Sequence, residues 1–175
     1  MENDPNPETT REPTLADLAQ LAQELNQRGA RYVVIGGLAM NLLGHARATF
    51  DVDLLIAASR ENQTKVKEAL ATMPDQAILE AGDDDIANYI VLRVNDVITV
   101  DLMTAACGVS YEEAASGIIW KEVQGVRIPI ANARLMLRLK QTYRDRDAED
   151  RRVIEDLLRA EAENLPLDAP SSSQT

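Results

Sequence analysis

The chain has 175 residues, about the size of one domain, and 45% of them are hydrophobic, which excludes wholesale disorder. A formal net charge of −11 and an aromatic share of 3% argue against a bulk electrostatic grip on DNA and against single-strand binding by base stacking. The single cysteine, Cys107, excludes an internal disulfide, and one Cys with one His excludes a zinc site of the usual kind.

The two ends of the chain are polar and contain Pro and Ser, without a periodic apolar pattern. We expect disordered tails over residues 1–12 and 164–175, around one domain over residues 13–163. The N-terminus is acidic, and no apolar run approaches about 18 residues, so we expect neither a signal peptide nor a membrane span. These features favour a soluble protein in a reducing, cytoplasmic compartment.

In chain order, the first half alternates helical and strand patterns. Thr14 is the expected N-cap of a helix that Gly29 ends, because apolar residues recur at helical spacing between them. The segment 49–57 is almost continuously apolar, which is typical of a central strand buried on both faces. The other expected elements are a strand over 31–35, a Gly36-Gly37 turn, a short helix over 38–43 and a helix over 60–73.

The second half predicts further strands and two C-terminal helices, giving an α/β (α+β) fold with a mixed sheet flanked by helices. Asn95-Asp96 and Gln124-Gly125 are the expected two-residue turns of two hairpins. Asp147 is the expected cap of the last helix. The expected segments are extended chain at 76–80, 88–94 and 97–103, a short helix at 111–115, a hairpin of 117–123 with 126–130, and helices at 132–142 and 147–160.

Three aspartates lie on apolar strands. Asp51 and Asp53 share a face because they are two positions apart, which places them roughly 7 Å apart along the strand. Burying two neighbouring carboxylates is costly unless a cation compensates them. If the strand that carries Asp101 lies beside them, three carboxylates converge and suit Mg²⁺ or Mn²⁺ for phosphoryl or nucleotidyl transfer.

Gly36-Gly37 separates a strand from a helix and presents backbone N–H groups to an anion such as a triphosphate. Alone, the pair also fits a simple turn. Together with Asp51-Val52-Asp53-Leu54 after thirteen intervening residues, it resembles the signature of the polymerase-beta-like nucleotidyltransferase superfamily. Within it, residues 34–54 look closest to the AbiEii-type and other minimal nucleotidyltransferases of bacterial toxin–antitoxin systems.

The resemblance covers residues 32–158 and implies a transferase that uses an NTP and a divalent metal. It implies Asp51, Asp53 and Asp101 as catalytic metal ligands, and Gly36 and Gly37 as the phosphate seat. A lysine near the triphosphate is common in this family, and the resemblance implies that role for Lys140. Many members carry Ser where this chain has Gly37, so a hydroxyl that could touch the terminal phosphates is missing.

Simpler explanations remain open for each residue. Asp51 and Asp53 could face solvent, and Asp101 could end a strand. Arg47 is placed to meet a phosphate but could be an ordinary surface arginine, and Lys140 borders a buried helix stripe. His45 follows a glycine beyond a short helix, where a polar residue needs no special role, and Cys107 fits a small buried hydrophobe.

Two functional hypotheses follow. The first is transfer of a nucleoside monophosphate to a hydroxyl of a protein, tRNA or small molecule, with the negative charge favouring protein or small molecule. In it Asp101 helps to deprotonate the acceptor. The second is a catalytically silent protein that binds a cognate partner protein, as one half of a toxin–antitoxin or similar pair. Neither the NTP nor the acceptor can be chosen from the sequence.

Overall fold

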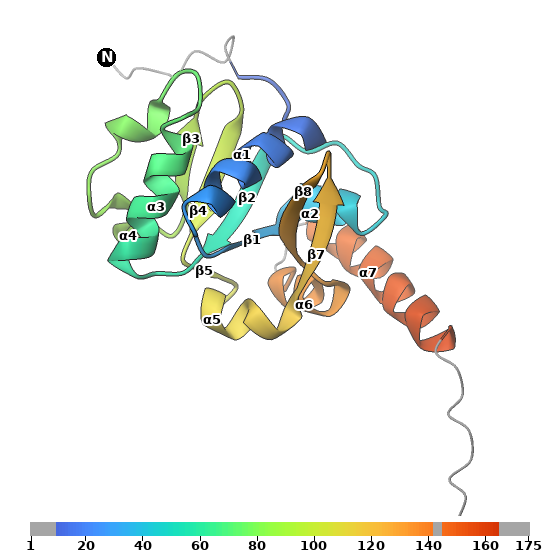
Figure 1. The fold of residues 1–175 in the computed structure, drawn as a ribbon. Coiled ribbons are helices and arrows are strands. Elements are labelled where there is room, and N and C mark those ends of the chain that lie inside the picture. The colour runs from blue at the N-terminus through green and yellow to red at the C-terminus, as the bar shows by residue number, and fades with distance from the viewer. Residues whose placement is uncertain (1–9, 142–144, 165–175) are drawn as a thin grey trace, which may run out of the picture.

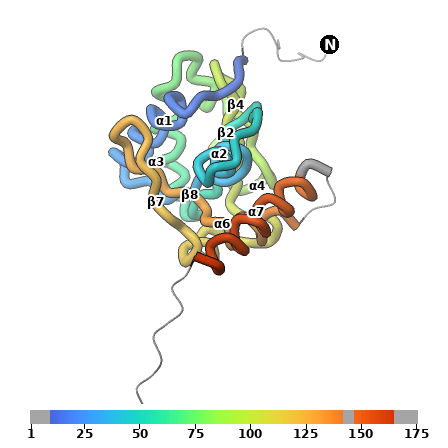
Figure 2. Tube along the Cα trace, turned by 90° about the vertical axis from the view of Figure 1, so that its right-hand side faces the viewer, coloured from blue at the N-terminus to red at the C-terminus, as the bar shows by residue number. Residues whose placement is uncertain are grey.

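The computed structural model describes residues 10–141 and 145–164. Helices α1 (Leu15–Gln27) and α3 (Arg60–Leu70) lie side by side on one side of a central sheet, and the C-terminal helix α7 (Asp145–Glu163) lies on the other (Figures 1 and 2). This arrangement confirms the α+β class with a mixed sheet and C-terminal helices.

Helix α1 begins and ends where the sequence indicates. The Thr14 side chain accepts from the Asp17 amide, and the Asp17 carboxylate accepts from the Thr14 amide, which makes a capping box. Gly29 follows the helix with φ +65°, a left-handed conformation that glycine adopts without strain. Five residues of one helix face are buried against the sheet and α3: Leu18, Ala19, Leu21, Ala22 and Leu25.

The central sheet has the strand order β3-β4-β2-β1-β8-β7 among the described residues. Strand β2 pairs with β1 in antiparallel and with β4 in parallel orientation, and β1 pairs with β8 in parallel. Because β2 has a neighbour on each side and a buried apolar core, its predicted central position is confirmed. The strands are β1 (Tyr32–Ile35), β2 (Asp51–Ile56), β3 (Leu92–Asn95), β4 (Thr99–Met103), β7 (Ile118–Val123) and β8 (Val126–Ala131).

The shorter elements complete the frame around this sheet. The predicted hairpin of β7 and β8 is present, with Gln124 and Gly125 both at positive φ in the turn. A second, two-stranded sheet pairs β5 with β6 among the residues described. The remaining elements are α2 (Gly36–Leu42), η1 (Ala77–Glu80), α4 (Asp85–Asn88), β5 (Ala105–Ala106), β6 (Val109–Ser110), α5 (Tyr111–Ala114), η2 (Ala115–Gly117) and α6 (Ala133–Leu139).

The buried carboxylate of Asp96 explains two wrong predictions. It accepts from the amides of Asp75 (3.1 Å), Ala77 (3.0 Å) and Val97 (2.8 Å). The chain at 76–80 is therefore curled into the 3₁₀ helix η1 instead of being extended. Asn95 pairs with Thr99, so the hairpin loop consists of residues 96–98 and not of the dipeptide 95–96.

The C-terminal helices also differ from the predicted ranges. Helix α6 begins after its N-cap Asn132 but ends at Leu139, and Thr142 lies outside the described residues. Asp147 lies inside the first turn of α7, which begins at Asp145, so it is not the cap. Its carboxylate instead accepts from Lys140 Nζ at 3.1 Å.

Part of the expected N-terminal tail is described. The Arg11 amide donates to the Val97 carbonyl at 3.0 Å, and the Arg11 side chain pairs with Asp17 at 2.7 Å. Residues 1–9 and 165–175 of the expected tails lie outside the described residues. No helix over the described ranges is both long enough and apolar enough to cross a bilayer.

Candidate functional site

Three carboxylates meet at the parallel pair of β2 and β4. Asp53 is the direct register partner of Asp101, and Asp51 is two residues before Asp53 on the same face of β2. Each residue offers one carboxylate oxygen, and these oxygens all lie within 4.8 Å of one another. The structure therefore brings together the acidic group that the sequence indicated, with Asp101 5% exposed.

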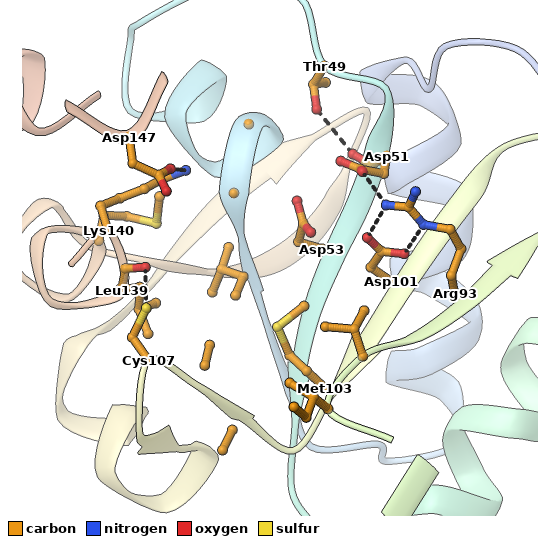
Figure 3. Close-up of a pocket in the computed structure, with 18 of the residues that line it drawn as sticks. Thr49, Asp51, Asp53, Arg93, Asp101, Met103, Cys107, Leu139, Lys140 and Asp147 are labelled. Atoms are coloured by element: carbon orange, nitrogen blue, oxygen red, sulfur yellow. Dashed lines mark hydrogen bonds and ion pairs between the residues drawn. The ribbon is translucent and has the colours of Figure 1, made fainter. Parts of the chain in front are cut away.

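An arginine that the sequence analysis missed binds two of these carboxylates. Arg93 lies opposite Asp101 across the β3–β4 hairpin. Its Nε and Nη2 donate to the two Asp101 oxygens at 2.8 and 2.7 Å, and Nη2 also donates to Asp51 Oδ2 at 3.1 Å. Figure 3 shows the guanidinium between the two carboxylates. In the sequence, Arg93 could have been found only from its position opposite Asp101 across the hairpin. The wrongly predicted turn hid this pairing.

The carboxylates are incompletely compensated by this single arginine. Burial, followed by the charges of Asp51 and Asp101, raises the pKa of Asp53 from 3.8 to about 7. Burial, followed by the Asp101 charge, also raises the pKa of Asp51. The hydrogen bond to Asp101 raises the pKa of Arg93, which keeps the guanidinium charged. A further cation would relieve the repulsion among the three carboxylates.

Position 36 requires glycine because its backbone lies against the Asp53 carboxylate. It has φ +70°, and a Cβ at this position would lie 2.0 Å from Asp53 Oδ2. No side chain fits there unless Asp53 moves. The backbone of the first turn of α2 therefore lies directly against the acidic group.

Gly37 contacts Thr49 in a similar way. A Cβ at position 37 would lie 2.5 Å from the Thr49 hydroxyl oxygen and 2.7 Å from its Cβ. Thr49 is 6% exposed, and its hydroxyl donates to the Asp51 carbonyl at 3.2 Å. The space beside Gly37 is thus filled by a hydroxyl-bearing side chain of the neighbouring loop.

The two cations that the sequence analysis assigned to phosphate are bound to helix α7. Arg47 Nη2 donates to Asp150 Oδ2 at 3.0 Å, and Lys140 Nζ lies 3.0 Å from the same oxygen. Asp150 is 1% exposed, and Lys140 also pairs with Asp147. Arg47 Nε is buried and has no hydrogen-bond partner among the described residues. Both cations still line the cleft that contains the carboxylates.

That cleft has a volume of about 1010 Å³ and carries different chemistry on different walls. The carboxylates and Arg93 lie on one side, and Lys140 with Asp147 lies across from them (Figure 3). Cys107, whose thiol donates to the Leu139 carbonyl at 3.2 Å, belongs to an apolar wall and is exposed, contrary to the buried position expected for it. The apolar wall comprises Ile35, Met103, Ala105, Ala106, Cys107, Met136 and Leu139. His45, in contrast, does not line this cleft.

The donor set fits a hard divalent cation. Carboxylate oxygens are the ligands that Mg²⁺ and Mn²⁺ prefer, and a cation here would offset the charge that raises the pKa of Asp53. Asp51, Asp53 and Asp101 would hold it.

Comparison with known proteins supports the fold. No protein-family model and no curated protein matches this sequence. An antigenic nucleotidyltransferase-like protein from Paracoccidioides brasiliensis is similar in structure, with a TM-score of 0.51 and 18% identity over 83% of this chain and 75% of that one. A candidate nucleotidyltransferase from Thermotoga maritima aligns over 85% of this chain and 92% of its own, with 16% identity and a TM-score of 0.48.

The chain has a nucleotidyltransferase-like fold. At 18% identity, the likeness to the Paracoccidioides protein establishes the fold and leaves the chemistry to be argued from the site.

Proposed function

We propose that this protein is a metal-dependent nucleotidyltransferase that moves a nucleoside monophosphate from an NTP to an acceptor hydroxyl. The observation that carries the proposal is the convergence of Asp51, Asp53 and Asp101 within 4.8 Å at a cleft of about 1010 Å³. A bound Mg²⁺ or Mn²⁺ would supply Lewis-acid activation of the acceptor and offset the phosphate charge.

The residues around the carboxylates would orient the triphosphate. Gly36 and Gly37 both line the cleft and carry no side chain of their own, which suits close approach of phosphate oxygens to their backbone. Arg47 and Lys140 line the same cleft, where Asp150 offsets the charge of both and Asp147 also pairs with Lys140. Because both pair with the buried Asp150, we propose that they fix helix α7 beside the part of the cleft that would bind the phosphates.

In the reaction, the acceptor oxygen bonds to the α-phosphorus while the bond from this phosphorus to the bridging oxygen breaks. Pyrophosphate leaves with the electron pair, and the hydroxyl proton passes to a carboxylate. The sequence points to Asp101 for this proton. Each Asp101 oxygen accepts one N–H bond from Arg93 and keeps a further lone pair, which is the position open to this proton.

Labelling and calorimetry test the proposal. Purified protein with Mn²⁺ and α-³²P-labelled NTPs should label a component of cell extract, and Asp51→Asn or Asp53→Asn should abolish both labelling and Mn²⁺-dependent NTP binding. Asp83→Asn is the matched control, since Asp83 is exposed and does not line the cleft. Equal metal binding by wild type and Asp51→Asn would contradict the proposed function.

For the acceptor, we favour a protein or a small molecule over tRNA. Among the described residues, each cation that lines the cleft is paired with a carboxylate: Arg93 with Asp101, and Arg47 and Lys140 with Asp150. A polyanionic acceptor therefore meets little free positive charge at this surface.

The second candidate, partner binding without catalysis, is favoured by one exposed apolar segment. Tyr89, Ile90 and Val91 are 57%, 88% and 41% exposed, and Ile90 and Val91 border the cleft. A cognate protein in a toxin–antitoxin pair is one such partner. Ile90→Glu should disrupt contact binding, with Leu79→Glu as control because Leu79 is 66% exposed outside the cleft. A contact role survives Asp51→Asn and Asp53→Asn in cells, whereas a transferase role does not.

A further inference from the structure

The positive charges at the cleft have partners of two kinds. Arg47 and Lys140 share Asp150, a carboxylate that is 1% exposed and belongs to helix α7. Arg93 instead pairs with Asp101 and Asp51, two of the proposed metal ligands, and its own side chain is 56% exposed. Only the partners of Arg93, among the described cleft cations, are groups that a divalent ion would also use.

The hydrogen bonds of Arg93 would conflict with metal coordination. Its guanidinium takes up both oxygens of Asp101 and one oxygen of Asp51, at 2.7 to 3.1 Å. A bidentate arginine occupies one lone pair on each carboxylate oxygen, and its positive charge reduces the attraction of that carboxylate for a metal ion. An ion bound by all three aspartates would also repel Arg93 in its present place, because a divalent cation and a guanidinium would then lie close together.

We infer that Arg93 is an exchangeable counter-ion of the carboxylate group. Without metal it neutralises part of the charge of Asp51 and Asp101. A divalent ion that binds these oxygens displaces it, and the freed guanidinium then binds a phosphate group of the incoming NTP. This inference rests on the proposed function, and it assigns a phosphate-binding residue that the sequence analysis did not include.

The chemistry of the freed side chain suits this second role. A guanidinium presents five N–H donors in a planar fork that matches phosphate oxygens, and it remains charged at every physiological pH. Arg93 lines the cleft, and its exposure leaves the side chain space to turn from the carboxylates toward the opening. Arg47 and Lys140 lack this freedom because a metal ion does not compete for Asp150.

Arg93→Met tests both halves of the inference by calorimetry. With Mn²⁺ alone, this variant should bind the ion roughly five- to tenfold more tightly than wild type, because an exposed competing ion pair has been removed. With saturating Mn²⁺, it should bind an ATP analogue with a methylene group between the α- and β-phosphorus roughly five- to tenfold more weakly. Equal or weaker Mn²⁺ binding, or unchanged analogue binding, overturns the inference.

Two further variants separate this result from other causes. Arg60→Met removes an exposed arginine that pairs with Asp84 outside the cleft and should leave both affinities unchanged. Arg93→Gln keeps hydrogen-bonding capacity without charge and is the second variant in case Arg93→Met folds poorly. It should shift both affinities in the directions given for Arg93→Met. If Asp51→Asn, in a chain that keeps Arg93, binds Mn²⁺ as tightly as the wild type does, the proposed function fails as well. If it does and Arg93→Met shows no gain, only the inference about Arg93 fails.

Discussion

Gly36→Ala compared with Gly29→Ala measures how closely the backbone of α2 constrains the carboxylate group. The two glycines have nearly the same φ, +70° and +65°, so an added methyl group costs each about 1 to 2 kcal/mol of left-handed strain. A Cβ at Gly29 meets nothing within 4 Å, whereas a Cβ at Gly36 would lie 2.0 Å from Asp53 Oδ2. Gly36→Ala should therefore cost about 1 to 3 kcal/mol more, the usual cost of overpacking.

Urea denaturation in EDTA, followed by circular dichroism, gives the two free energies of unfolding. Because Asp53 must move to admit the methyl group, Gly36→Ala should also weaken Mn²⁺ binding at least tenfold, which is the usual effect of disturbing the support of a metal ligand. Gly29→Ala should leave the Mn²⁺ affinity unchanged. Equal unfolding free energies for the two variants, with equal Mn²⁺ affinities, would refute the contact between Gly36 and Asp53.

Three other measurements test separate parts of the site and fold. The Asp53 carboxyl has a pKa of 3.8 in the unfolded chain, and burial with its charged neighbours raises this pKa to about 7 in the folded protein. The unfolded chain therefore releases this proton first, and metal-free protein should lose stability as the pH rises from about 4 to about 7. Asp53→Asn should flatten that slope in urea denaturation with EDTA. Gly37→Ser should lower stability by roughly 1 to 3 kcal/mol through collision with the Thr49 hydroxyl and Cβ. In a Thr49→Gly background, which lacks both atoms, Gly37→Ser should cost much less, and an equal cost in the two backgrounds would exclude the collision. Asp96→Asn should cost roughly 2 to 4 kcal/mol, because three backbone amides lose a charged acceptor; a loss below about 1 kcal/mol would show that they are satisfied otherwise.

Local patterns were sufficient to predict most of the fold. The helix from Thr14 to Gly29, the buried β2 and the β7–β8 hairpin each depend on residues close together in the chain, such as a capping box or a Gln124-Gly125 turn. The convergence of Asp51, Asp53 and Asp101 followed from strand periodicity and one assumed neighbour pairing. Side-chain alternation and apolar runs determined these features.

The wrong or missing features depend on contacts between distant residues. Asp96 binds the amides of Asp75 and Ala77 about twenty positions earlier, and no local pattern contains that information. The same residue lengthens the hairpin loop and so sets which residue of β3 lies opposite Asp101. The predicted two-residue turn at 95–96 would pair Val94 with Val97 and place Ile90 opposite Asp101, three positions from Arg93 and on the other face of the strand.

The acidic composition of the chain has a specific consequence at the cleft. From the sequence, a net charge of −11 argued only against broad contact with a nucleic acid. In the structure, carboxylates of β2 and β4 hold Arg93, and carboxylates of α7 hold Arg47 and Lys140. The first pairing involves groups that a divalent ion would claim, and the second is buried. If the proposed function holds, an NTP would meet a positive charge that metal binding releases, so we predict that metal binds before nucleotide because of where these acidic residues lie.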